Sequence, residues 1–147
     1  MGMFDSFDIN ASGMTAQRFR MDIISQNVAN ANTTRTADGS PYVRKVVTFV
    51  EKDSQTPFHH VLNEATDRYS GKGGKINGVY EDNESQMNMV YDPAHPDADE
   101  NGYVTYPNVN IITEMTNLID ASRSYEANAT AFNASKSIAL QGLNIGK

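Results

Sequence analysis

The chain has 147 residues, a formal net charge of −6 and no cysteine. This length favours one domain, the acidic balance argues against nucleic-acid binding, and the absence of cysteine excludes disulfides, thiolate nucleophiles and cysteine-based zinc sites. Hydrophobic residues make up only 39% of the chain and charged residues only 20%. We expect such a composition in a subunit whose surfaces are mostly covered by neighbours.

Residues 1–32 are predicted to form an N-terminal coiled-coil helix. Its apolar side chains recur every seven residues, at Phe7, Met14, Met21 and Val28. This spacing is typical of a helix seam. Gly13 lies inside the helix at a cost of about 1 kcal/mol relative to alanine, which packing must offset. The Asn- and Thr-rich run from Asn27 onward is expected to end the helix, because these side chains compete for backbone hydrogen bonds.

Residues 33–106 are predicted to form a β-rich insert with loops. The segment 42–50 is the clearest strand, because most of its side chains are β-branched or aromatic. Residues 76–80 and 86–91 are expected to pair with each other as a hairpin across a short turn. Residues 92–102 are expected to form an acidic, proline-containing loop that leads toward the last helix.

The acidic loop opens like the calcium loop of an EF-hand, with Asp97, Asp99, Asn101 and Gly102 at matching positions. The twelfth position should supply a bidentate glutamate, but it holds Asn108. Prolines also interrupt the helix that should precede such a loop. We therefore interpret this segment as an acidic turn, and the sequence predicts no metal and no cofactor.

Residues 107–147 are predicted to form the C-terminal coiled-coil helix. Asn108 or Asn110 is the expected N-cap, and Gly142 is the expected residue just beyond the helix end. The seven-residue repeat of this helix consists of Ile111, Leu118, Tyr125 and Phe132. Many alanines and few charges leave the helix without a charged face. It therefore has either one intramolecular partner or, as we favour, several neighbours in an assembly.

Together these patterns predict an α+β fold in which the N- and C-terminal helices pair as a coiled coil and flank a small β-rich insert. The eight repeat residues of the two helices form the predicted assembly interface. No catalytic residue is predicted, because no titratable cluster can be placed on rigid elements. No apolar stretch is long enough to insert into a membrane as a helix. A secreted helical-hairpin adhesin or chaperone-like binding module is the competing interpretation.

Four segments of the chain resemble the bacterial flagellar rod proteins. The first, 25–33, carries an Asn-rich signature, and the others are 34–46, the acidic loop at 92–104, and 107–128. The resemblance covers nearly the whole chain and is weakest over 53–90. It implies a structural subunit of the proximal rod, without enzymatic activity, that assembles helically, transmits torque from motor to hook and supports motility.

The resemblance also implies partners and a location. The implied partners are proximal and distal rod proteins, the adaptor between rod and MS ring, copies of the chain itself and the flagellar type III export apparatus. The implied location is the basal body, as a periplasmic rod within the cell envelope. The N-terminus has Asp5 where a signal peptide would be basic, so we expect export without a cleaved signal peptide.

We predict that the two terminal helices are largely disordered in the isolated subunit. The second helix is rich in Asn, Ser and Thr and poor in charge pairs, so its intrinsic helix propensity is mediocre. Limited proteolysis of dilute protein should trim both ends and leave a fragment near residues 38–106. Equal protease resistance along the whole chain would contradict this prediction.

Overall fold

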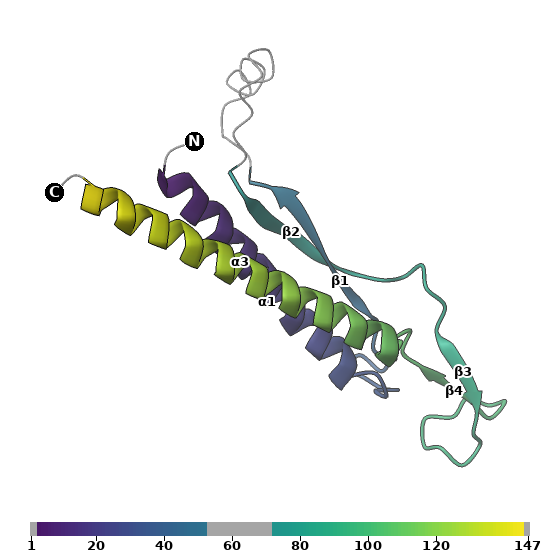
Figure 1. The fold of residues 1–147 in the computed structure, drawn as a ribbon. Coiled ribbons are helices and arrows are strands. Elements are labelled where there is room, and N and C mark those ends of the chain that lie inside the picture. The colour runs from purple at the N-terminus through teal and green to yellow at the C-terminus, as the bar shows by residue number, and fades with distance from the viewer. Residues whose placement is uncertain (1–2, 53–71, 146–147) are drawn as a thin grey trace, which may run out of the picture. The chain divides into compact units, whose positions relative to one another are not determined.

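The predicted α+β arrangement is confirmed. A computed structural model describes residues 3–52 and 72–145. In chain order, its elements are α1 (Met3–Ala29), β1 (Lys45–Glu51), β2 (Gly74–Glu81), β3 (Asn88–Tyr91), β4 (Tyr103–Tyr106) and α3 (Ile111–Ile145). Two long helices thus flank a small β insert, as Figure 1 shows.

The chain divides into two compact units, and each helix contributes to both. The first unit is drawn from Met1–Phe19, Phe49–Asn77 and Ala121–Lys147. The second unit is drawn from Arg20–Thr48 and Gly78–Asp120. Both units therefore contain a segment of α1, a segment of α3 and part of the insert, and neither could form from a single stretch of sequence.

The strands pair differently from the expected hairpin between 76–80 and 86–91. β1 pairs with β2, and β3 pairs with β4 in a separate antiparallel sheet. In that sheet Asn88 lies opposite Tyr106, and Tyr91 lies opposite Tyr103. The ladder continues into the loop, where the Asp92 amide donates to the Gly102 carbonyl over 2.9 Å. The prediction missed β4 because its four residues lie between the acidic loop and the helix cap.

The ends of the helices also differ in part from expectation. Asn110 caps α3 as predicted, because its side-chain oxygen accepts the amides of Ile112 and Thr113 at 3.0 and 3.2 Å. The expected stop at Gly142 is wrong, since α3 continues to Ile145. A single glycine costs an exposed helix only about 1 kcal/mol and does not by itself end it.

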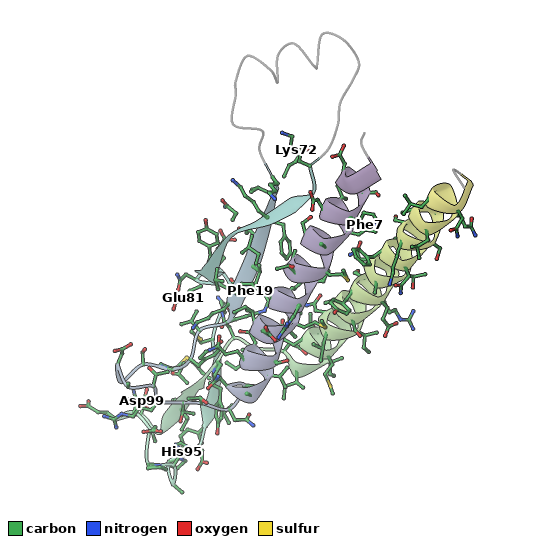
Figure 2. All side chains as sticks on the ribbon, turned by 90° about the vertical axis from the view of Figure 1, so that its left-hand side faces the viewer. Phe7, Phe19, Lys72, Glu81, His95 and Asp99 are labelled. Carbon is green, nitrogen blue, oxygen red and sulfur yellow. The ribbon has the colours of Figure 1, made fainter. Side chains whose placement is uncertain are left out.

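In the first unit the segments of α1 and α3 lie side by side and run antiparallel. Phe7 of α1, which Figure 2 labels, meets Phe132 of α3 edge to face, with ring centroids 5.1 Å apart. Nearer the middle of each helix, Gly13 faces Asn128, whose side-chain nitrogen would lie 2.9 Å from a β-carbon at Gly13. The glycine that looked costly in the sequence therefore admits the partner helix at close range.

A second glycine lets the insert approach α1 in the first unit. Gly73 has a φ of +88°, and a β-carbon there would collide with Ser12 Oγ and lie 3.3 Å from the Ile9 Cα. The neighbouring Gly74 amide donates to Ser12 Oγ over 3.2 Å. The segment that opens β2 is therefore held against the helix by a contact that leaves no room for a side chain.

We predict that Gly73→Ala destabilises the protein more than Gly39→Ala does. Both glycines have positive φ, but nothing lies within 4 Å of a β-carbon at Gly39. Gly39→Ala should cost about 1–2 kcal/mol of unfolding free energy, from the left-handed backbone alone. Gly73→Ala should cost roughly 1–3 kcal/mol more, from overpacking against α1. Urea denaturation of both variants measures this difference, and equal losses would contradict the close approach.

Candidate functional site: the helix seam and a buried polar cluster

The predicted interface residues fall into two groups in the structure. Phe7 and Phe132 are brought into direct contact. The side chains that are half-buried without reaching the interior are Met14, Met21, Val28 and Leu118. Ile111 and Tyr125 are exposed, at 43% and 36% of their full area. The subunit alone therefore covers only part of this set.

The most deeply buried face of α3 is offset from the predicted repeat. Glu114 and Ala121, seven residues apart, are 1% and 0% exposed, and Asn128 continues the spacing opposite Gly13. On α1 the most buried residues include Ile24 and Asn27. The faces that meet inside the subunit are thus small or polar, and they leave the larger apolar residues of α3 half-buried or exposed.

Asn27 lies at the centre of a buried polar cluster in the second unit. Its side-chain nitrogen donates to the Lys45 carbonyl at 2.8 Å and to Glu114 Oε2 at 3.0 Å. Its side-chain oxygen accepts the Tyr42 hydroxyl and the Lys45 amide, both at 2.9 Å. Two donors and two acceptor sites are the full capacity of an asparagine amide. The expectation that Asn27 helps to end the helix is therefore wrong, because its amide is occupied by tertiary contacts.

The cation of the cluster is Arg44, which binds the buried Glu114 with two nitrogens. Arg44 Nε and Nη2 donate to Glu114 Oε1 at 2.9 and 2.8 Å, and Nη1 reaches Asp82 Oδ2 at 3.3 Å. Partial burial alone would lower the pKa of Arg44, but the two carboxylates outweigh it and raise that pKa. Arg44 therefore stays charged, and it compensates a carboxylate that would otherwise be buried without a partner.

The cluster extends through Asn108 to the turn that follows β2. The Arg44 amide donates to Asn108 Oδ1 at 2.9 Å, and Asn108 Nδ2 donates to the Asp82 carbonyl at 2.7 Å. The hydroxyl and amide of Ser85 hold the pKa of Asp82 below its ordinary value of 3.8, with help from Arg44. Burial, and then the charge of Glu114, raises the pKa of Tyr42. These pKa shifts keep Arg44 and Asp82 charged and Tyr42 neutral near neutral pH.

The cluster joins four segments that lie far apart in the sequence. It connects the end of α1, the start of β1, the turn after β2 and the first turn of α3. Every titratable group named above is already engaged by another group of the cluster. The arrangement is therefore suited to positioning these segments rather than to acid–base chemistry.

Sequence reasoning missed this cluster although it left a signal. Glu114 is the only charged residue on the inward heptad face of α3, where Ala121 and Asn128 follow it. A carboxylate on a buried helix face requires a cationic partner. Arg44, inside the segment 42–50 predicted as the clearest strand, is that partner.

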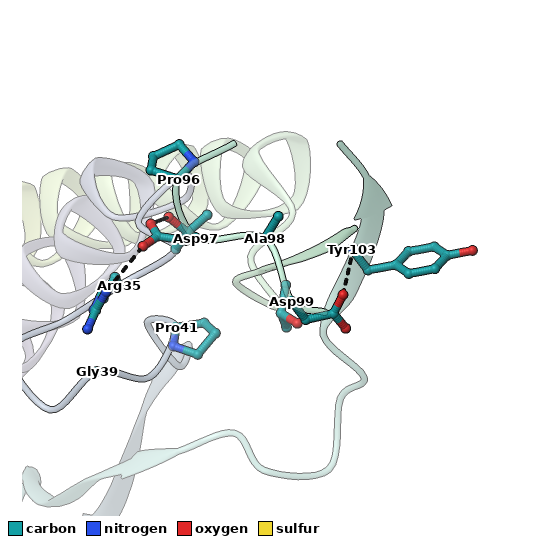
Figure 3. A pocket seen from close by; sticks show the side chains of 10 residues that line it. Arg35, Gly39, Pro41, Pro96, Asp97, Ala98, Asp99 and Tyr103 are labelled. Atoms are coloured by element: carbon teal, nitrogen blue, oxygen red, sulfur yellow. Dashed lines mark hydrogen bonds and ion pairs between the residues drawn. The ribbon is translucent and has the colours of Figure 1, made fainter. Parts of the chain in front are cut away.

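The acidic loop lines a hollow of about 300 Å³ in the second unit (Figure 3). Asp97 accepts the Thr34 hydroxyl at 2.8 Å and lies 3.6 Å from the Arg35 guanidinium. Asp99 Oδ1 accepts the amides of Asn101 and Tyr103 at 2.9 and 2.8 Å. Asp99 therefore stabilises the turn itself, while Asp97 ties the loop to Thr34 and Arg35, which supports the interpretation of this segment as an acidic turn.

Two features of the described residues bear on other functions. Within residues 3–52 and 72–145, no three His, Asp or Glu side chains gather closely enough to hold a metal ion. Neither helix in that part of the chain is both long and apolar enough to span a membrane.

Comparison with known proteins gives matches over the whole chain. Residues 7–35 match the family described as "Flagella basal body rod protein", and residues 100–145 match "Flagellar basal body rod FlgEFG protein C-terminal". The flagellar basal-body rod protein FlgC of Bacillus subtilis is 43% identical over 153 residues, covering 100% of both chains. FlgC of Borreliella burgdorferi is 42% identical over 99% of this chain and 98% of its own. FlgC of Salmonella typhimurium is 37% identical over 100% of both.

We predict that Arg44→Met costs about 3–5 kcal/mol of unfolding free energy, because it leaves Glu114 buried without a cation. The double variant Arg44→Met/Glu114→Met should recover most of that loss, since it removes both charges. Arg35→Met is the matched control: its side chain is 68% exposed, so its loss should stay within about 1 kcal/mol. Chemical denaturation tests all three variants, and similar losses for Arg44→Met and Arg35→Met would refute a supporting role for the cluster.

Proposed function

The chain belongs to the FlgC family of flagellar basal-body rod proteins, and from this membership we propose that it assembles helically in the proximal rod and transmits torque from the motor to the hook. It is a structural subunit of the rod and serves bacterial motility. The observation that carries the mechanical part of the proposal is the joining of α1 and α3 at Asn27 and Glu114.

Torque transmission requires that the helices of a subunit neither slide nor separate under load. Apolar contact is non-directional and permits sliding, whereas two nitrogens of Arg44 converge on one carboxylate oxygen of Glu114 and give this charged contact a fixed direction. The Phe7–Phe132 pair provides directional contact in the first unit. We infer that each unit holds its own segments of the helix pair in register while load passes along them.

The proposed assembly interface consists of the eight repeat residues, of which Ile111 and Tyr125 are the most exposed. Exposed apolar side chains at heptad spacing are suited to packing against helices of other subunits. We propose different roles in assembly for the helix over 1–32, the insert over 33–106 and the helix over 107–147. The two helices form the inner contacts of the rod, and the insert forms contacts between neighbouring subunits.

A basal-body rod protein associates with other rod components. We propose in addition that the chain contacts proximal and distal rod proteins, the adaptor to the MS ring and copies of itself. We further propose that it is exported by the flagellar type III apparatus without a cleaved signal peptide, and that it resides in the periplasmic part of the rod. A purely structural role, without catalysis, is supported by relatives named as rod proteins.

We predict that Phe132→Asp or Leu118→Asp abolishes incorporation into the rod. Either change places a carboxylate without a partner at a helix interface, which costs about 3–5 kcal/mol. The variants should be made and exported but not built into the rod, leaving cells without hook or filament. Swimming assays and electron microscopy of basal bodies provide the measurement.

The matched control is Thr130→Asp, on the exposed face of the same helix. Thr130 is one turn from the exposed Glu126 and donates its hydroxyl to the Glu126 carbonyl over 2.9 Å. A second carboxylate there should cost only tenths of a kcal/mol, so cells should swim. Motile cells carrying Phe132→Asp at normal protein levels would contradict both the seam assignment and the assembly proposal.

A further inference from the structure

Each sheet of the insert consists of two strands, so every strand has an outer edge whose backbone groups need other partners. The edge of β1 is occupied by α1, because the Asn27 side chain bonds both the N–H and the C=O of Lys45, at 2.9 and 2.8 Å. At the start of β2 the Gly74 amide donates to Ser12 Oγ of the same helix over 3.2 Å. Side chains of α1 therefore satisfy edge groups of both strands in this sheet.

The outer edge of β4 is occupied by the acidic loop. Asp99 Oδ1 accepts the Tyr103 amide at 2.8 Å (Figure 3), and the Asp99 amide donates to the Tyr103 carbonyl over 2.9 Å. One residue of the loop thus bonds both backbone groups of Tyr103, as a neighbouring strand would. Unpaired edges invite pairing with other chains, and native proteins usually cover or interrupt them.

The outer edge of β3 has no such partner. The Asp92 amide bonds the Gly102 carbonyl, and in an antiparallel pair only alternate residues direct their backbone groups toward the partner strand. In this register Val90 faces β4, whereas the N–H and C=O groups of Met89 and Tyr91 point away from it. Within residues 3–52 and 72–145, nothing bonds these outward groups. The outer edge of β3 is therefore open to a further strand.

The side chains of β3 are also available for contact. All four residues of the strand are exposed, and none of them is charged or a proline. Met89 and Tyr91, which are 63% and 64% exposed, lie on one face of the strand, and Val90, 48% exposed, lies on the other. Charged residues and prolines are common means of keeping an edge strand unpaired. An uncharged strand with apolar side chains on both faces is suited to pairing.

We propose that the outer edge of β3 binds an extended segment of a different rod protein, which adds to the β3–β4 sheet as a third strand along Met89 and Tyr91. Such a segment pairs its own backbone groups with the outward groups of these two residues and packs apolar side chains against theirs. This inference rests on the proposed association with other rod proteins, and it names the surface and the kind of segment that meet.

A second copy of this chain is not suited to supply that segment. Its strands β1, β2 and β4 have edge groups that are already bonded within the copy. Its β3 is open, but a contact between β3 and β3 uses the same edge on both copies. Such a contact closes a dimer, whereas a helical assembly requires contacts that continue from one subunit to the next.

Photo-cross-linking in living cells tests this contact in the assembled rod. Tyr91 is replaced by p-benzoyl-L-phenylalanine, which keeps an aromatic ring at the edge. Cells that also make the unaltered chain are irradiated, their basal bodies are purified, and the partner in the cross-linked product is identified by mass spectrometry. The expected product is an adduct between this chain and a different rod protein.

Three results of this experiment would overturn the proposal. They are an adduct of two copies of this chain, an adduct with a protein outside the rod, and the absence of any adduct from the altered chain recovered in basal bodies. Recovery of the chain in basal bodies leaves the proposed rod function intact, and its absence from them would contradict that function instead. The two failures are therefore distinguishable.

A proline substitution distinguishes backbone pairing from side-chain contact. Met89→Pro removes one outward N–H and leaves the ladder to β4 intact, at a position where edge strands tolerate proline. Met89→Thr is the matched control, since it keeps the N–H and suits a strand. With the photoreactive residue at position 91, Met89→Pro should lower the adduct yield per chain in basal bodies about fivefold, because one hydrogen bond is lost. Met89→Thr should change it by less than about twofold.

Equal adduct yields from the proline and threonine variants would show a contact made by side chains alone and would overturn strand addition. Should Met89→Pro fail to fold, the cross-link at Tyr91 in the otherwise unaltered chain still decides the proposal.

Discussion

The structure of the second unit depends on the requirement that the buried carboxylate of Glu114 be neutralised where it lies. A carboxylate 1% exposed is compatible with a stable fold only if a cation and hydrogen bonds replace its water. Arg44 provides the cation, and Asn27 provides a further hydrogen bond. Meeting this requirement draws α1, β1 and α3 to one point, and Asp82 and Asn108 add the turn after β2. The local arrangement of the insert follows from one charged side chain on a helix face.

The same contact solves a problem created by the composition of the helices. Where two helices meet through glycine, alanine and asparagine, few large side chains interlock. A shift by one heptad therefore meets little steric resistance. Gly13 and Asn27 are two heptads apart on α1, as are their partners Asn128 and Glu114 on α3. The contacts in each unit therefore specify the same register of α1 against α3 independently. A one-heptad slip would place Glu114 away from both Asn27 and Arg44, so polar specificity replaces the interlocking of large side chains.

The long-range periodicity of the sequence predicted the helices well, because a heptad pattern sustained over four repeats has few other interpretations. The pairing of strands was not predicted, since β4 was not recognised as a strand and β2 was therefore paired with β3. The role of Asn27 was predicted wrongly because the side chain of an asparagine near a helix end more often bonds the helix's own backbone than a distant segment. The inward face of α3 was not predicted, because it carries Glu114 and Ala121 while several isoleucines of the helix face outward.

The hydrogen bonds between Asn27 and Lys45 determine how α1 can separate from β1. The Asn27 amide bonds both the N–H and the C=O of Lys45, as a neighbouring strand would, so one side chain substitutes for a strand at that edge. A strand would have to be peeled away bond by bond, but this contact is released by the rotation of a single residue. Buried ion pairs likewise fix geometry while adding little net stability. The edge of β1 at Lys45 is thus held in one arrangement by a single side chain, which can release it in one step.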